Sequence, residues 1–210
     1  MTVGIIDYGA GNFASVWNAF QKHGRKLIAV TEAADLRQCS HVVLPGVGAF
    51  SSAMEQLAKT GLTAHLRELL LHGTTPFLGI CVGMQVLGSR GTELTPSEGL
   101  GIVQGAVTKL ELPNDAPALA LPHMGWSDVA VAPGSVMFRG IDIGDPSFYF
   151  LHSYALQSTD GSALFSYCDY GRPFIAALEK GSVFGVQFHP EKSQRNGNRL
   201  IANFLDFTGG

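Results

Sequence analysis

The cysteine at position 81 lies in a segment that is typical of a reactive nucleophile. It is the middle residue of Gly79–Gly83, which reads Gly-Ile-Cys-Val-Gly. A short apolar run, 77–80, predicts a strand before it, and a helix is predicted from about Met84. Gly-x-Cys-x-Gly in that setting has the form of a nucleophile elbow, with sulfur in place of the serine oxygen. We expect the two glycines to permit the sharp turn and the helix N-terminus to favour the thiolate.

A histidine and a carboxylate that could serve this cysteine follow a later apolar run. Residues 183–188 predict a strand that ends in His189-Pro190-Glu191. Positions i and i+2 of an extended chain face the same way, so His189 and Glu191 are predicted side by side. A histidine near Cys81 could take the thiol proton and later protonate a leaving amine, while Glu191 orients the imidazole. The pattern predicts a Cys-His-Glu triad in preference to a histidine of the core.

The loop Pro45–Gly48 is a candidate for the site that stabilises a negative oxygen in the transition state. It follows a predicted strand, and Gly46 and Gly48 flank Val47, so its backbone amides could turn toward a substrate. Together with the amide of Val82 they could form an oxyanion hole. An ordinary strand-to-helix turn explains the same spacing, so both interpretations stand.

The order of the predicted elements favours a single α/β domain over residues 1–210. Strands alternate with helices over the first hundred residues, which is typical of a parallel sheet covered on both faces, with function at the carboxyl ends of its strands. Shorter runs broken by Gly and Pro then predict an antiparallel and mixed sheet beside that core. The predicted strands are 3–6, 27–30, 41–44, 77–80, 106–110, 127–131, 147–151, 164–167, 174–178 and 183–188, and the predicted helices are 13–24, 51–59, 62–72, from about 84, and 199–207.

Composition excludes several classes of partner. The 210 residues are 46% hydrophobic and 15% charged, and the net charge of -3 gives no reason to expect nucleic acid or an anionic membrane. No apolar run approaches the roughly 18 residues of a spanning helix, and no signal peptide is visible. The three cysteines form no Cys-x-x-Cys pair, which favours a reducing cytoplasm. We expect no metal and no cofactor.

One segment near the start suggests a different class of protein. Gly9–Ala14 matches G-x-G-x-x-A between a predicted strand and a predicted helix, and Glu32 follows at about the distance of a ribose-binding acid. A nicotinamide dinucleotide site is therefore an alternative. No second mononucleotide-binding half follows, so the triad is the favoured interpretation.

Longer stretches around these motifs resemble a known family. Gly-Ile-Cys-x-Gly-Met-Gln at 79–85 and Gln-Phe-His-Pro-Glu-Lys at 187–192 resemble the class I (triad) glutamine amidotransferases. Within them, the match narrows to the glutaminase subunits of imidazole glycerol phosphate synthases. The resemblance covers residues 3 to about 195, with Ser127 and Ala14 departing from the usual Asn and Arg. The stretches that carry it are 5–12, 44–50, 149–154 and, most specific to these subunits, Pro-His-Met-Gly-Trp at 122–126.

The resemblance implies a flavodoxin-like fold and hydrolysis of glutamine to glutamate and ammonia. It implies that Cys81 is the nucleophile, His189 the base and acid, and Glu191 the orienting carboxylate. The oxyanion strand would be Gly46, Val47 and Gly48 with the Val82 amide, while Gln85, Ser153 and Tyr154 would hold glutamine and Glu93 its amino group.

The resemblance also implies a partner, a separate TIM-barrel cyclase in a heterodimer. Trp126, Tyr149 and Lys192 would lie near the interface and the ammonia entrance. There ammonia would react with a phosphoribulosyl-formimino aminoimidazole carboxamide ribonucleotide, giving imidazole glycerol phosphate and aminoimidazole carboxamide ribonucleotide in histidine biosynthesis. A partner that modifies nucleotide-linked sugars is the alternative.

Overall fold

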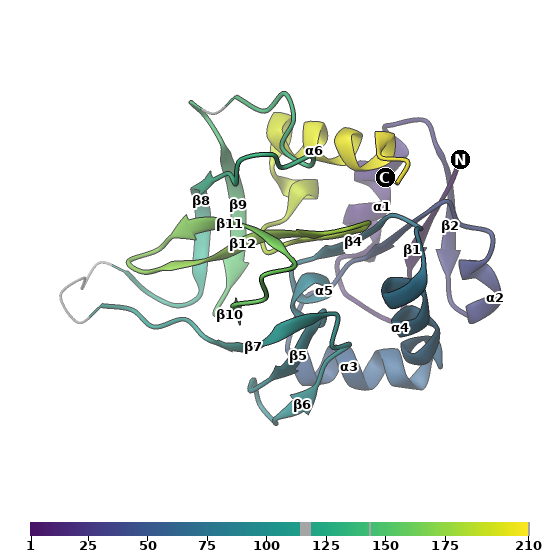
Figure 1. Ribbon diagram of the computed structural model, residues 1–210, viewed down its shortest axis with the longest axis horizontal. Coiled ribbons are helices and arrows are strands. Elements are labelled where there is room, and N and C mark those ends of the chain that lie inside the picture. The colour runs from purple at the N-terminus through teal and green to yellow at the C-terminus, as the bar shows by residue number, and fades with distance from the viewer. Residues whose placement is uncertain (114–118, 143, 210) are drawn as a thin grey trace.

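One large sheet runs through the computed structural model, which describes residues 1–113, 119–142 and 144–209. Within those residues nine strands pair in this sheet (Figure 1). In spatial order they are β2 (Lys26–Val30), β1 (Thr2–Ile6), β3 (His41–Leu44), β4 (Phe77–Ile80), β13 (Val183–Val186), β12 (Pro173–Lys180), β11 (Leu164–Asp169), β8 (His123–Ala130) and β9 (Ser147–His152).

The first five strands of that order pair in parallel, and the last four continue the sheet in antiparallel pairs. The order β2-β1-β3-β4-β13 is the 2-1-3-4-5 order of flavodoxin-like folds. All four residues of β4 are buried, which explains its uninterrupted apolar sequence at the centre of the sheet. The predicted α/β class is confirmed.

Helices cover both faces of the parallel part (Figure 1). On one face lie α1 (Phe13–Gln21) and α6 (Gln194–Asp206), and on the other α3 (Phe50–Lys59) and α4 (Leu62–His72), while α2 (Ala33–Leu36) lies beside the edge strand β2. Phe204 of α6 packs edge-on against Phe20 of α1 and Phe184 of β13. No helix of the described ranges is long and apolar enough to span a membrane.

A second, smaller sheet lies next to α3 and contains strands that the sequence did not predict. Its order is β10 (Tyr154–Ser158), β7 (Val103–Lys109), β5 (Gly88–Gly91) and β6 (Ser97–Glu98). Of these only β7 was predicted, in part, because β5 and β6 are short and lack apolar alternation. The chain crosses from the large sheet to the small one at Ser153, between β9 and β10.

The segment around Cys81 differs from the prediction in two ways. The helix predicted to continue from Met84 begins at Val82 and ends at Gln85 as α5 (Val82–Gln85), because the chain then enters β5. The strained residue of the turn is Cys81 itself, with φ 55° and ψ -110°. The two glycines serve close packing instead: a Cβ on Gly79 would lie 2.4 Å from the carbonyl oxygen of Gly83.

Gly83 gives a test of this packing. A Cβ there would lie 1.9 Å from the carbonyl oxygen of Leu44 in β3, so Gly83→Ala must displace the turn or the strand. We expect Gly83→Ala to lower the free energy of unfolding by about 2 to 3 kcal/mol, measured by urea denaturation. Gly161→Ala is the control, because nothing lies within 4 Å of its Cβ position. Equal stability of the two variants would contradict this account.

Candidate functional site

Two adjacent parallel strands bring Cys81 and His189 to the same edge of the sheet. Ile80 of β4 pairs with Val186 of β13, and the amide of Cys81 donates to the carbonyl oxygen of Val186 at 2.7 Å. Three residues further on, the amide of His189 donates to the carbonyl oxygen of Tyr149 at 2.9 Å. Both side chains are buried, so the predicted nucleophile and base lie together at the carboxyl ends of their strands.

Glu191 is hydrogen-bonded to His189, as predicted, but through a turn instead of an extended chain. Nδ1 of His189 lies 2.8 Å from Oε1 of Glu191. His189 is extended, whereas Glu191 lies in the 3-10 helix η1 (Pro190–Lys192), which folds the carboxylate back toward the imidazole. The pairing is therefore a product of the turn after Pro190 and not of i, i+2 strand geometry.

Asn12 is a further member of this group that the sequence did not reveal. It lies in the Gly9–Ala14 segment that suggested a dinucleotide site, and its Nδ2 donates to Oε1 of Glu191 at 3.3 Å. Asn12 is only 5% exposed, so this bond is made inside the protein. The loop after β1 thus contributes to the orientation of the carboxylate. The available signal was an asparagine immediately before a helix, in the loop that follows a buried strand.

The charge state of His189 follows from its neighbours. Burial lowers the pKa of its imidazole, but the interactions with Cys81 and Glu191 outweigh burial and raise the pKa to about 10. Because Nδ1 is bonded to Glu191, Nε2 is the ring nitrogen left for the thiol, and it has no hydrogen-bond partner among the residues that the structure describes. The site therefore favours a protonated His189 beside the Cys81 sulfur at neutral pH.

A cavity of about 120 Å³ opens onto Cys81 and His189. It contains most of the predicted oxyanion and substrate-binding residues, while Gly46 and Glu191 do not line it. Leu151 and His152 line it as well and were not predicted. The full lining is Val47, Gly48, Cys81, Val82, Gln85, Glu93, Leu151, His152, Ser153, Tyr154 and His189.

The loop Pro45–Gly48 passes close to the turn that carries Cys81. A Cβ on Gly46 would lie 2.8 Å from the backbone nitrogen of Gly83, so only glycine allows this approach. Gly48 has φ 96°, and Val47 between the two glycines is 37% exposed. As the first residue of α5, Val82 has no acceptor for its amide within the helix. These positions suit donors to a substrate oxygen at the cavity.

Gln85 lies at the cavity wall with its amide nitrogen already occupied. Its Nε2 donates to the carbonyl oxygen of Tyr154 at 2.8 Å and to Oε1 of Gln187 at 3.1 Å. Its own Oε1 is buried and has no partner within the described residues. That oxygen is therefore the atom of Gln85 that can accept a hydrogen bond from a bound ligand.

Glu93 connects the cavity to the start of α3. Its Oε2 accepts the amide of Phe50 at 3.1 Å, and Phe50 is the first residue of the helix that follows the loop Pro45–Gly48. Burial raises the pKa of the Glu93 carboxyl, and the Phe50 amide partly offsets this effect. The carboxylate thus borders the cavity from the loop between β5 and β6.

Two buried histidines form a polar row behind the cavity. Nδ1 of His152 lies 2.9 Å from the carbonyl oxygen of Tyr154, which can only accept, so Nδ1 carries the proton. Nε2 of His152 must then accept from Nδ1 of His123 at 3.3 Å. Nε2 of His123 in turn accepts from the Ser127 hydroxyl at 2.9 Å. Ser127, one of the sequence departures, thus directs its hydroxyl proton into the protein.

Tyr149 on β9 lies between the other two predicted interface residues, Trp126 on β8 and Lys192 in η1. The rings of Trp126 and Tyr149 are 6.1 Å apart and edge-on, and Nζ of Lys192 lies 5.8 Å from the centre of the Tyr149 ring. Trp126 is 47% exposed and Met124, on the same face of β8, is 65% exposed. Met124, Trp126 and Tyr149 form an apolar surface with the Lys192 cation beside it, and this surface is called the β8 surface below.

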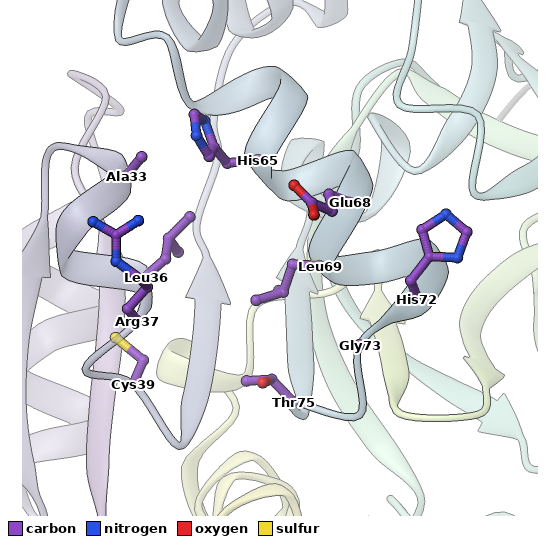
Figure 2. Close-up of a pocket in the computed structure, with 10 residues that line it drawn as sticks. All are labelled: Ala33, Leu36, Arg37, Cys39, His65, Glu68, Leu69, His72, Gly73 and Thr75. Atoms are coloured by element: carbon purple, nitrogen blue, oxygen red, sulfur yellow. The ribbon is translucent and has the colours of Figure 1, made fainter.

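A larger hollow of about 460 Å³ lies elsewhere, between α2 and α4 (Figure 2). Cys39 and Thr75 in its wall precede β3 and β4, so it lies at the amino ends of the strands, away from Cys81. Leu36 and Leu69 project into the space between the two helices. In the described part of the chain, no group of three His, Cys, Asp or Glu residues is arranged to hold a metal ion.

Comparison with known proteins identifies relatives along nearly the whole chain. The family glutamine amidotransferase class-I matches residues 4–207. Two proteins named imidazole glycerol phosphate synthase subunit HisH, from Caulobacter vibrioides and Zymomonas mobilis, are 43% and 42% identical to this chain. The first match covers 98% of both chains, and the second covers 98% of this chain and 96% of the relative.

Solved structures agree on the fold. A crystal structure of a glutamine amidotransferase superposes with a TM-score of 0.72 at 18% identity and covers 97% of both chains. A glutamine amidotransferase from Thermotoga maritima gives a TM-score of 0.61 at 18% identity, covering 98% of this chain and 83% of the other. At such identities these likenesses support the fold alone.

The His123–His152 pair makes a prediction about pH and stability. Burial lowers the pKa of His123 to about 4 and that of His152 to about 3, although in His152 the Tyr154 carbonyl opposes it. Both values lie below the unfolded value near 6.5, so the stability that depends on neutral imidazoles is complete above pH 6.5. This stability is lost as the pH falls from 6.5 toward the folded-state pKa values, about 4 for His123 and about 3 for His152.

We therefore expect the stability advantage of the wild type over His123→Phe to shrink by about 1 kcal/mol between pH 7 and pH 5, measured by urea unfolding. Gly161→Ala is the control: it changes no titratable group, so its difference from the wild type should not depend on pH in this way. A constant difference for His123→Phe would show that the imidazole does not titrate as described.

Proposed function

Because this chain belongs to the class-I glutamine amidotransferases, and within them to the HisH subunits of imidazole glycerol phosphate synthase, we propose that Cys81, His189 and Glu191 hydrolyse the amide of glutamine. The observation that carries the proposal is the hydrogen-bonded His189–Glu191 pair beside a strained cysteine at the mouth of a cavity. The chain acts as a glutaminase in histidine biosynthesis and supplies ammonia to a cyclase.

The first half of the reaction forms a thioester. The Cys81 thiolate attacks the side-chain amide carbon of glutamine, and the carbonyl oxygen becomes negative. Amides of Val47, Gly48 and Val82 donate to that oxygen; losing one such donor typically costs about 3 kcal/mol of transition-state stabilisation. When the C–N bond breaks, Nε2 of His189 gives its proton to the nitrogen, which leaves as ammonia.

The second half restores the enzyme. His189 is now neutral, and its Nε2 takes a proton from a water molecule that attacks the thioester carbon. The C–S bond breaks, glutamate leaves, and the sulfur departs as a thiolate beside the protonated imidazole. Glu191, held by Asn12, keeps Nδ1 of His189 protonated throughout, so that Nε2 is always the nitrogen that exchanges the proton.

The remaining cavity residues suit a free amino acid. Oε1 of Gln85 can accept from an N–H group of glutamine, because it is buried at the cavity wall without another partner among the residues described. The Glu93 carboxylate provides a charge for the α-amino group, and Ser153 and Tyr154 border the other side. A few polar groups placed in this way in the wall of a cavity fix the orientation of a bound small molecule.

The partner that we propose is a TIM-barrel cyclase that binds the β8 surface to form a heterodimer. Trp126 and Tyr149 give that surface an aromatic centre of the kind enriched in protein interfaces, and Lys192 adds a cation next to the Tyr149 ring. Ammonia would pass to a ribonucleotide acceptor on the partner. The HisH relatives favour this partner over one that modifies nucleotide-linked sugars. We place the pair in the cytoplasm.

Replacing the nucleophile tests the chemistry. We expect Cys81→Ala to lower glutamine hydrolysis by more than about 10⁴-fold, because no other group can form the thioester. Synthesis by the complex with added ammonia should continue at the wild-type rate, since the acceptor site lies on the partner. Cys39→Ala is the control, because burial holds the pKa of that thiol at about 11, and it should retain full activity. Glutaminase activity in Cys81→Ala would refute the assignment.

Replacing Trp126 tests the docking surface. We expect Trp126→Ala to raise the Kd for the cyclase roughly 30-fold, or about 2 kcal/mol, because it removes the exposed aromatic centre of the β8 surface. Leu71→Ala on α4 is a matched control, since Leu71 is 56% exposed on another face, and should change the Kd less than about twofold. Calorimetric titration measures the Kd of each variant. Equal Kd values for Trp126→Ala and the wild type would place the interface elsewhere.

A further inference from the structure

Gln187, two residues before His189, directs its side-chain amide at the reactive sulfur. Nε2 of Gln187 lies 3.6 Å from Sγ of Cys81, within range for an N–H donor to sulfur. Gln187 is completely buried. Its backbone amide donates to the carbonyl oxygen of Ala176 at 2.8 Å. It does not line the cavity, so it approaches the sulfur from the protein interior and not from the substrate side.

The network behind Gln187 determines which end of its amide faces the sulfur. The carbonyl oxygen of Tyr154 can only accept, so Gln85 must present its NH₂ group there, at 2.8 Å. The same NH₂ group then donates to Oε1 of Gln187 at 3.1 Å. With its oxygen held in this way, Gln187 can present only its nitrogen, a donor, to Cys81.

We propose that Gln187 is a catalytic residue that stabilises the Cys81 thiolate by a hydrogen bond, as a second donor beside His189. This role rests on the proposed function, in which Cys81 is the nucleophile. Cys81 is 3% exposed, so its charge has little water to stabilise it, and α5 is a single turn that provides only a short helix dipole. The side-chain amide of Gln187 is a fixed neutral donor, so it stabilises the charge on the sulfur in place of water and exchanges no proton.

A donor at this position favours both chemical steps. Before attack it increases the fraction of Cys81 present as thiolate. After the thioester has formed, the sulfur carries no full charge and the hydrogen bond weakens. It strengthens again when water displaces the sulfur as a thiolate leaving group. His189 is neutral while the thioester exists and regains a proton only as water attacks, whereas the Gln187 donor stays in place throughout the cycle.

The experiment measures the pH dependence of Cys81 alkylation by iodoacetamide in the full chain, read by peptide mass spectrometry. Gln187→Leu removes the donor, and Gln187→Glu keeps the shape while placing an acceptor next to the sulfur. Gln157→Leu on the exposed face of β10 is the matched control. We expect the alkylation midpoint to rise by about one pH unit in both Gln187 variants and to stay unchanged in Gln157→Leu.

Steady-state kinetics of the complex with the cyclase give a second readout. In the Gln187 variants we expect kcat for glutamine hydrolysis at pH 7 to fall about tenfold, because the donor to the sulfur is lost. We expect KM to change less than twofold, because Gln187 does not line the cavity. Circular dichroism establishes that each variant is folded. If Gln187→Leu does not fold, Gln187→Glu provides the same test, because its carboxylate still accepts the hydrogen bond from Gln85.

An unchanged alkylation midpoint in the folded variants would overturn the role of Gln187. That result is distinguishable from failure of the proposed function, which Cys81→Ala tests separately. If Cys81→Ala is inactive and the midpoint does not move, only Gln187 is wrong. If Cys81→Ala still hydrolyses glutamine, the nucleophile itself is wrong, whatever the midpoint does.

Discussion

The parallel pairing of β4 with β13 is the constraint on which the site depends. It aligns Ile80 with Val186, and the amide of Cys81 extends the ladder by one more bond to the Val186 carbonyl. Cys81 and His189 are more than a hundred residues apart in sequence, yet the strands that carry them end side by side. In the proposed reaction neither residue acts without the other, since a buried thiolate needs a cation nearby and a buried imidazolium needs an anion.

The turn after β4 shows how the fold accommodates a strained residue. Cys81 adopts positive φ, and the surrounding backbone is packed so closely that Gly79 and Gly83 leave no space for a Cβ. The loop Pro45–Gly48 from the neighbouring strand β3 approaches the same turn through Gly46. Close packing of three backbone segments therefore holds the nucleophile, the Val82 amide and the proposed oxyanion loop in a fixed relation.

Buried polar side chains extend from the reactive sulfur to the outer strands of the sheet. Hydrogen bonds connect Cys81 through Gln187 and Gln85 to the carbonyl oxygen of Tyr154. From there they continue through His152, His123 and Ser127, next to Trp126 on β8. Each member has one orientation allowed by its neighbours, so the network fixes the direction of every donor. In a low-dielectric interior these bonds are stronger than in water, and the one open position is Oε1 of Gln85, which has no partner among the described residues.

The sequence by itself determined the α/β class and the central strands, and it predicted a Cys-His-Glu triad. Short apolar runs with glycines at their ends have few alternative folds, and Gly-x-Cys-x-Gly with His-Pro-Glu limits the chemistry. Resemblance to glutamine amidotransferases supplied the remaining site residues, and the cavity contains most of them.

Only the tertiary structure decided how these residues work together. The sequence misplaced the strain, which lies at Cys81, and the contact between His189 and Glu191, which a 3-10 turn creates. Asn12 and Gln187 were invisible as site residues, because their partners lie 179 and 106 positions away in sequence. Local propensity and spacing describe one segment at a time, whereas hydrogen bonds between distant segments exist only once the sheet has brought the segments together.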